Sequence, residues 1–410
     1  MEYQTIDSEN NPVSYPKKRS HAALWILIPT VWAISLILVA AVVFLATRSR
    51  NDNDQLLLDA VRDVHGFIRE NYYFYNENEN ALIDAALKGM ASGTGDNYAY
   101  YYSAEEYAEL QKQNEGSFVG IGILTVMEDD GAVRIVDVYA NTPASEAGLL
   151  AGDQLIEING VSYEGLDLSG FLDNMIAEEG AENSITVLRN GETLTFTIVP
   201  REVHTPSVSY RMLNDTVGYL RLTTFHGACV EEAKTALKEL QAQGMKSLVF
   251  DLRDNLGGSL YDALDIADLF LPKNRLITSL RSRTDEEETF YTKTDGIDLP
   301  IVLLVNDYSA SASELVAGAW KDYGTAYLIG TQTYGKGIVQ SYFSIPETNG
   351  MLKITTEAYY TPNGICIHGI GITPDEVVEL SEEAQRYSIS VLPFELDTQL
   401  QAAIAYLETH

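Results

Sequence analysis

Residues 247–258 read Ser-Leu-Val-Phe-Asp-Leu-Arg-Asp-Asn-Leu-Gly-Gly, an apolar run that ends in charged residues and a pair of glycines. A short apolar run bounded by turn residues is typical of a strand that is buried on both faces. Apolar side chains then recur at helical spacing from Leu260 to Phe270. The stretch therefore predicts a buried strand, a tight glycine loop and a helix.

The same order of strand and helix continues on both sides of this stretch. Further strands are predicted at Val217–Leu222, Ile301–Val305 and Tyr327–Ile329, and further helices at Val230–Gln243 and Ala312–Lys321. Such alternation indicates helices packed on a mostly parallel sheet. Between residues 116 and 200, short alternating strands and Asn-Gly turns instead predict a compact β domain with two helices.

An uncharged segment near the amino terminus predicts a membrane anchor. Ala22–Ala46 is 25 residues long, enough to cross a hydrocarbon core of roughly 30 Å as a helix. The basic residues Lys17–Arg19 precede it and favour a cytoplasmic amino terminus. A cleaved signal peptide is the alternative, although the apolar region is long for one. We expect a cytoplasmic tail at 1–20, a single transmembrane helix at 21–47, and everything after it outside the cytoplasmic membrane.

Composition excludes several classes of protein. The formal net charge of −32 would repel nucleic acid, and no basic stripe is visible. The two cysteines, Cys229 and Cys366, cannot form a disulfide framework and lack the spacing of metal ligands. Two unrelated thiols are favoured over a single disulfide. No metal and no cofactor is predicted.

Two loops carry residues that could perform chemistry. Residues 306–314 read Asn-Asp-Tyr-Ser-Ala-Ser-Ala-Ser-Glu, and Ser311 falls at a helix start, where N–H groups favour a developing negative charge. The alternative is a structural capping box made by Ser311 and Glu314. Lys336 lies between two glycines in a second loop and could act as a general base if burial removed its proton. The alternative is a solvated surface lysine.

The histidines do not suggest a conventional catalytic triad. None of the six stands in a context that predicts a base oriented by a carboxylate, and none forms a metal-binding pair. His226 and His368, in strand-rich regions, are interpreted as structural. The glycine pair at 257–258 could present N–H groups to an oxyanion, but it lacks the spacing of a nucleotide-binding loop. A serine–lysine pair is therefore the better proposal.

Taken together, these segments resemble the carboxyl-terminal processing, or tail-specific, serine peptidases. The similarity extends from about Leu56 to Leu407. The motifs that carry it are Asp96–Tyr100, Ser117–Gly122, Pro143–Asp153, Asp251–Gly258, Ser309–Glu314, Tyr334–Gln340, Tyr359–Gly364 and Gly371–Asp375.

The resemblance implies a multidomain α/β and α+β fold. A crotonase/ClpP-like peptidase core at 201–380, similar also to tricorn protease, would follow an inserted PDZ domain at 116–200. An amino-terminal helical region at 53–115 would come before the PDZ domain and after the single transmembrane helix. A carboxyl-terminal helical region at 381–410 would contribute to homodimers.

The resemblance also implies the roles of individual residues. Ser311 would be the nucleophile, Lys336 the base, and Gln340 the residue that orients the lysine. The oxyanion hole would be formed by N–H groups of Ala312 and of Gly257 or Gly258.

In the PDZ domain, a bound peptide would add itself as a strand along Ile123 and contact Leu172. Its terminal carboxylate would accept hydrogen bonds from the turn formed by Gly120, Ile121 and Gly122. The predicted partners are thus protein or peptide substrates with a free carboxyl terminus, and a second copy of the chain.

The function predicted is that of a membrane-anchored serine endopeptidase on the extracytoplasmic side of the cell membrane. A catalytically inactive PDZ scaffold is one alternative, which the intact Ser311, Lys336 and Gln340 disfavour. An esterase on a related core is another, which the peptide-binding domain disfavours.

Overall fold

The computed structural model describes residues 54–75, 78–114, 116–127, 131–139, 141–164, 166–175, 178 and 180–410. Contacts divide the chain into two units, Met1–Leu82 and Ile83–His410. The predicted transmembrane segment at 21–47 lies outside the described residues, among which no helix has the length and apolarity needed to cross a membrane. In the first unit, residues 54–71 form a helix, and α2 (Glu79–Ser92) begins.

The predicted β domain contains two sheets and two short helices. β2 (Ser117–Gly120) pairs with β9 (Arg201–His204), and a larger sheet has the strand order β3-β4-β5-β7-β8, with β6 paired to β5. The bounds of the larger sheet are Ile123–Met127, Val133–Val138, Gln154–Ile158, Val161–Ser162, Asn183–Arg189 and Glu192–Ile198, and the helices are α4 (Pro143–Ala147) and α5 (Leu168–Leu172). β3 lies at the sheet edge.

The first two strands of this domain, β2 and β3, follow each other closely but pair with different partners. Between them lies Gly122, whose φ of +81° favours glycine. A Cβ on Gly122 would also lie 2.5 Å from the Thr142 side chain. The preceding Ile121 inserts its side chain into the domain core, with 2% of its surface exposed.

The region from 201 to 380 contains the expected parallel sheet. Its strand order is β10-β11-β12-β15-β16-β19, in which β10 is antiparallel and the other neighbours are parallel. The bounds are Val208–Met212, Val217–Leu222, Ser247–Asp251, Ile301–Val305, Tyr327–Gly330 and Glu376–Val377.

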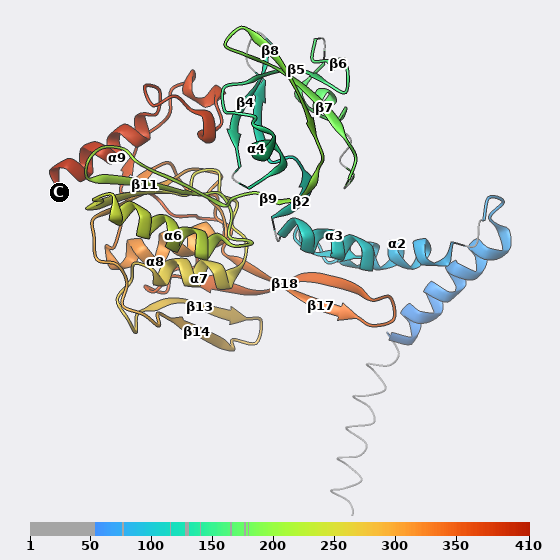
Figure 1. The fold of residues 1–410 in the computed structure, drawn as a ribbon. Coiled ribbons are helices and arrows are strands. Elements are labelled where there is room, and N and C mark those ends of the chain that lie inside the picture. Colours follow the sequence, from blue (N-terminus) through green and yellow to red (C-terminus); the bar gives the residue numbers. More distant parts are fainter. Residues whose placement is uncertain are drawn as a thin grey trace, which may run out of the picture. The chain divides into compact units, whose positions relative to one another are not determined.

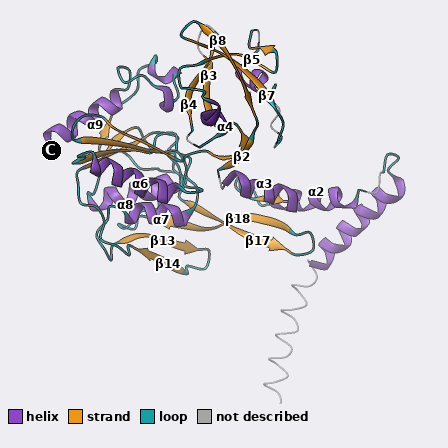
Figure 2. Ribbon diagram, viewed as in Figure 1, coloured by secondary structure: helices purple, strands orange, loops and turns teal. Residues whose placement is uncertain are grey.

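Helices cover both faces of this sheet (Figures 1 and 2). α6 (Cys229–Ala242), α7 (Leu260–Asp268) and α8 (Ala312–Tyr323) share one hydrophobic core with alternate residues of the strands. α9 (Thr398–Thr409) packs on the opposite face through Leu400 and Ala403. The apolar face of α9 is thus buried within the chain, and the contribution of the region 381–410 to homodimers stays a prediction.

A second sheet adjoins the loops that carry Ser311 and Lys336. Its strand order is β1-β18-β13-β14, and β17 pairs with β18 in a long hairpin. The bounds are Tyr100–Tyr102, Gly350–Tyr360, Leu276–Ser282, Glu287–Tyr291 and Ile338–Ile345, and α3 (Ala104–Asn114) follows β1.

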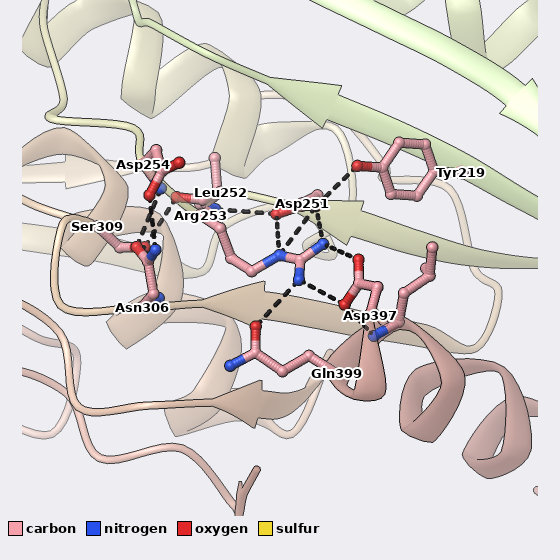
Figure 3. A network of polar contacts seen from close by, with 10 residues as sticks. Tyr219, Asp251, Leu252, Arg253, Asp254, Asn306, Ser309, Asp397 and Gln399 are labelled. Atoms are coloured by element: carbon pink, nitrogen blue, oxygen red, sulfur yellow. Dashed lines mark hydrogen bonds and ion pairs between the residues drawn. The ribbon is translucent and has the colours of Figure 1, made fainter. Parts of the chain in front are cut away.

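A buried ionic network joins α9 to the end of β12 (Figure 3). The Arg253 guanidinium, with 0% of its residue surface exposed, donates to Asp251 Oδ2 at 2.7 Å and to Asp397 at 2.8 and 2.9 Å. It also donates to Gln399 Oε1 at 3.0 Å, while the Tyr219 hydroxyl donates to Asp251 at 2.7 Å. Burial alone would raise the pKa of Asp251, but Arg253 holds that pKa below its usual value.

We predict that Arg253→Ala lowers the free energy of unfolding by about 3–5 kcal/mol, because Asp251 and Asp397 would remain buried without their counter-charge. The matched control is Lys234→Ala, which removes the exposed ion pair between Lys234 and Glu231 and costs at most about 1 kcal/mol. Urea denaturation of both variants measures the difference. Equal losses in the two variants would contradict the structural role given to Arg253.

Candidate active site

The three serines at the start of α8 have different environments. Ser309 Oγ donates to Leu252 O and Ser313 Oγ donates to Asn255 O, both at 2.8 Å, and both side chains are fully buried. Ser311 is half-buried and lines a cleft of about 810 Å³. Ser311 is thus the serine of the three that a substrate could reach.

The backbone of Ser311 differs from that of an ordinary helix cap. Its φ of +56° and ψ of −111° lie outside the extended region that capping serines adopt. Positive φ in a residue with a side chain is costly and is found at functional sites. The capping box predicted from Ser311 and Glu314 is present at least in its return half, since Ser311 N–H donates to Glu314 Oε2 at 2.9 Å.

Glu314 joins the serine loop to the lysine loop. Its carboxylate is fully buried and accepts hydrogen bonds from Thr333 Oγ1 and Gly335 N, both at 2.6 Å, and from Lys336 N at 2.8 Å. With the bond from Ser311 N, four donors converge on one carboxylate. Glu314 therefore fixes the backbones of both candidate catalytic residues, a role that the capping pattern did not predict.

Glycines allow the lysine loop to pack closely. Gly335 has φ +90°, and a Cβ on Gly337 would lie 2.5 Å from His368 N. The backbone on both sides of Lys336 is thereby held against residues 367–371.

Lys336 is half-buried and lines the same cleft as Ser311. Burial, and then the Lys353 ammonium, lower the pKa of Lys336, while the carboxylates of Asp96 and Glu314 oppose this change. Within the described residues Lys336 Nζ forms no hydrogen bond to Ser311. It lies instead 4.5 Å from the centre of the Tyr98 ring.

The glycine pair lies directly beside the serine. Gly257 and Gly258 have φ of +100° and +149°, and a Cβ on Gly257 would lie 2.7 Å from Ala310 O. Gly257 N–H already donates to Asn255 Oδ1 at 2.9 Å. In the described part of the chain, no acceptor is found for the N–H groups of Gly258 and Ala312, so these two fit an oxyanion hole best.

All six residues predicted for catalysis line this one cleft: Ser311, Lys336, Gln340, Ala312, Gly257 and Gly258. Gln340 points its amide to Thr355 Oγ1 at 3.2 Å, and no described contact joins it to Lys336. Its role in orienting the lysine stays a prediction. His226 also lines the cleft, and burial lowers its pKa.

The predicted peptide-binding residues lie on three elements of the β domain. Gly120 ends β2, Ile123 begins the edge strand β3, and Leu172 is in α5. Ile121 O accepts from Ala144 N at 2.9 Å and Gly122 O from Tyr139 N at 3.0 Å. No acceptor for the N–H groups of Ile121 and Gly122 is found among the described residues. Since the Ile121 side chain is buried, only its backbone could meet a peptide. Ile123 and Leu172 are half-buried and pack against the same core.

Comparison with known proteins assigns both regions. The family model for peptidase family S41 matches residues 216–378, and that for the PDZ domain matches residues 119–199. A carboxy-terminal-processing protease from Bartonella bacilliformis is 35% identical over 360 residues, which cover 85% of this chain and 82% of that protein. The chain belongs to the S41 peptidase family.

Other relatives agree with this assignment. A probable CtpA-like serine protease from Staphylococcus aureus strain MRSA252 is 32% identical, over 95% of this S41 peptidase and 79% of that protein. A solved structure of a Bacteroides fragilis protein assigned to the S41 proteases is also similar. The alignment covers 82% of this chain and 91% of that protein's chain, with a TM-score of 0.55 and a sequence identity of 20%. That structure supports the fold alone.

Sequence reasoning missed the contact between Tyr98 and Lys336. The segment Asp96–Tyr100 was noticed only as a motif of the resemblance, without a role for any of its side chains. Its aromatic character gave no sign of contact with Lys336, because the two residues are brought together by β18 and not by sequence spacing.

Proposed function

We propose that this S41 peptidase is a membrane-anchored serine endopeptidase that recognises polypeptide carboxyl termini through its PDZ domain and cleaves with a Ser311/Lys336 dyad. The observation that carries the proposal is the shared cleft. An accessible serine, a half-buried lysine and two N–H groups that have no acceptor among the described residues meet there. These are the parts that acyl transfer requires.

In the proposed reaction, Ser311 Oγ attacks the scissile carbonyl carbon while Lys336 Nζ accepts the hydroxyl proton. The N–H groups of Ala312 and Gly258 stabilise the negative oxygen of the tetrahedral intermediate. Lys336 then gives the proton to the leaving amine, and water hydrolyses the acyl-enzyme at Ser311. A lysine can start this sequence only when neutral, which the pKa-lowering effect of burial supports.

The edge position of β3 supports the proposed recognition of carboxyl termini. An extended peptide can add to an unpaired strand edge, and N–H groups at a turn can bind its terminal carboxylate. The acidity of the chain opposes this binding, because a net charge of −32 repels a free carboxylate over the screening length of about 8–10 Å. The hydrogen bonds that the N–H groups of Ile121 and Gly122 donate to the carboxylate would have to stabilise the complex by more than this repulsion destabilises it.

An inactive PDZ scaffold is the second candidate function. It is favoured by one observation, the absence of a hydrogen bond between Lys336 Nζ and Ser311 within the described residues. Cleavage of peptides by the purified protein would support the peptidase, and no cleavage would support the scaffold. The serine variants described next test whether the cleavage depends on Ser311.

Ser311→Ala should abolish peptide cleavage and change the free energy of unfolding by less than about 1 kcal/mol. The matched control Ser313→Ala should keep turnover but lose about 1–2 kcal/mol of stability, because Asn255 O loses its buried donor. Peptide hydrolysis and chemical denaturation on both variants test this pair. Turnover by Ser311→Ala would reject Ser311 as the nucleophile.

Amidating the carboxyl terminus of a peptide substrate should weaken its binding to the full chain, measured by calorimetry in the Ser311→Ala background. Added salt should improve the binding of acidic peptide tails, since it screens the repulsion by the protein. Equal affinities for matched free-acid and amide peptides would show that the PDZ domain does not bind carboxyl ends.

Membrane anchoring and dimerisation are further parts of the proposal. The uncharged segment 21–47 supports the anchor, and exposed apolar side chains on the helix at 54–71 support contact with a second copy. Those side chains are Leu56, Leu57, Leu58, Val61, Val64 and Phe67.

One experiment on wall-stripped cells tests both parts. Externally added protease should digest residues 54–410, and a cross-linker applied to undigested cells should give a species of twice the chain mass. Protection of the chain until lysis would reverse the proposed topology, and a monomer alone would reject the dimer.

A further inference from the structure

Lys336, which lines the cleft, contacts Tyr98, a residue from a distant part of the chain. Lys336 Nζ lies 4.5 Å from the centre of the Tyr98 ring, inside the range of about 6 Å for a cation–π contact. The negative face of an aromatic ring attracts an ammonium group but offers little to a neutral amine. The contact therefore favours the protonated form of Lys336, which cannot act as a base.

The two partners are held by separate anchors. On one side, the Asp96 carboxylate accepts from Tyr98 N at 2.9 Å and from Thr355 N at 3.0 Å, which fixes the turn before β1 on β18. On the other side, Glu314 holds the backbone of Lys336 at 2.8 Å. Because neither anchor includes the ring or the ammonium, the framework places the two groups together independently of their attraction.

Tyr98 itself is suited to remain uncharged. Burial, followed by the neighbouring Tyr334 hydroxyl, raises the pKa of the Tyr98 phenol above its usual value. The ring therefore acts as a neutral aromatic surface throughout the pH range in which a lysine base would titrate.

We infer that Tyr98 is a positioning residue that holds the protonated Lys336 side chain apart from Ser311 in the resting enzyme. Catalysis then requires the amine to leave the ring as it loses its proton and turns to the serine hydroxyl. This inference rests on the proposed role of Lys336 as the base. It adds a side chain outside the dyad that sets the pH at which the dyad becomes active.

Other charges around Lys336 are unchanged when the ring is removed. The carboxylates of Asp96 and Glu314 favour the ammonium form, and the Lys353 ammonium disfavours it. The Tyr334 side chain interacts with that of Tyr98 through a hydrogen bond. Replacing only the Tyr98 side chain retains these four groups. Tyr98→Leu and Tyr98→Phe both remove the hydroxyl that interacts with Tyr334, so the difference between these two variants isolates the contribution of the ring.

The test is the pH dependence of kcat/KM for Tyr98→Leu and Tyr98→Phe. Loss of the ring should move the lower limb of the profile to lower pH by about 0.5–1.5 units, because the protonated lysine loses its cation–π partner. Tyr98→Phe keeps an aromatic face and should retain the limb near its original position. A limb unmoved or raised in Tyr98→Leu, or moved equally in both variants, would overturn the inference.

A second measurement separates this inference from the proposed function. In the Ser311→Ala background, the pKa of Lys336 can be followed by NMR of isotopically labelled lysine, with the signal assigned through Lys336→Arg. The pKa should fall on Tyr98→Leu and stay close to its original value on Tyr98→Phe. If Tyr98→Leu does not fold, Tyr98→Met serves as the second ring-free variant. A lowered pKa in a protein without peptidase activity would reject only the proposed function, whereas an unchanged pKa in an active enzyme would reject only the role of Tyr98.

Discussion

The Glu314 carboxylate is the constraint on which the active site depends. A buried carboxylate is costly unless several donors satisfy it, and here four donors from two loops do so. The same bonds that satisfy Glu314 bring the backbone of Ser311 next to that of Lys336. Glu314 on α8 therefore fixes the relative position of the two loops that border the cleft.

A second buried charge supports the other side of the cleft. Arg253 binds Asp251 and Asp397, so the residues just before the glycine pair are tied to α9. Asn255 continues this support by accepting from Gly257 N and, through its carbonyl, from Ser313 Oγ. These bonds fix the loop that contains the glycine pair. The N–H group of Gly258 has no acceptor among the described residues and is available to a substrate.

The fold was largely predictable because its strongest signals are local. Each central strand of the parallel sheet is a short apolar run, and α6 to α8 carry apolar side chains at helical spacing. The β17–β18 hairpin was not predicted from periodicity. Its residues are mostly half-buried on both faces, so they do not alternate between apolar and polar side chains.

The sequence predicted which residues form the candidate site, but it did not predict the contacts between them. Ser311 and Lys336 were identified by their loops and by the family resemblance, and the structure places them in one cleft. The additional bonds of Glu314 and the position of Tyr98 depend on contacts between distant segments, for which the local sequence carries no signal.

The central claim is that Ser311 is the activated nucleophile of this cleft. Incubating the full chain with a fluorophosphonate, followed by intact-mass measurement and peptide mapping, tests it most directly. The account predicts one adduct per chain, located on Ser311 and lost when Lys336 is replaced by alanine. An adduct on another residue, or one that forms equally fast without Lys336, would contradict the account.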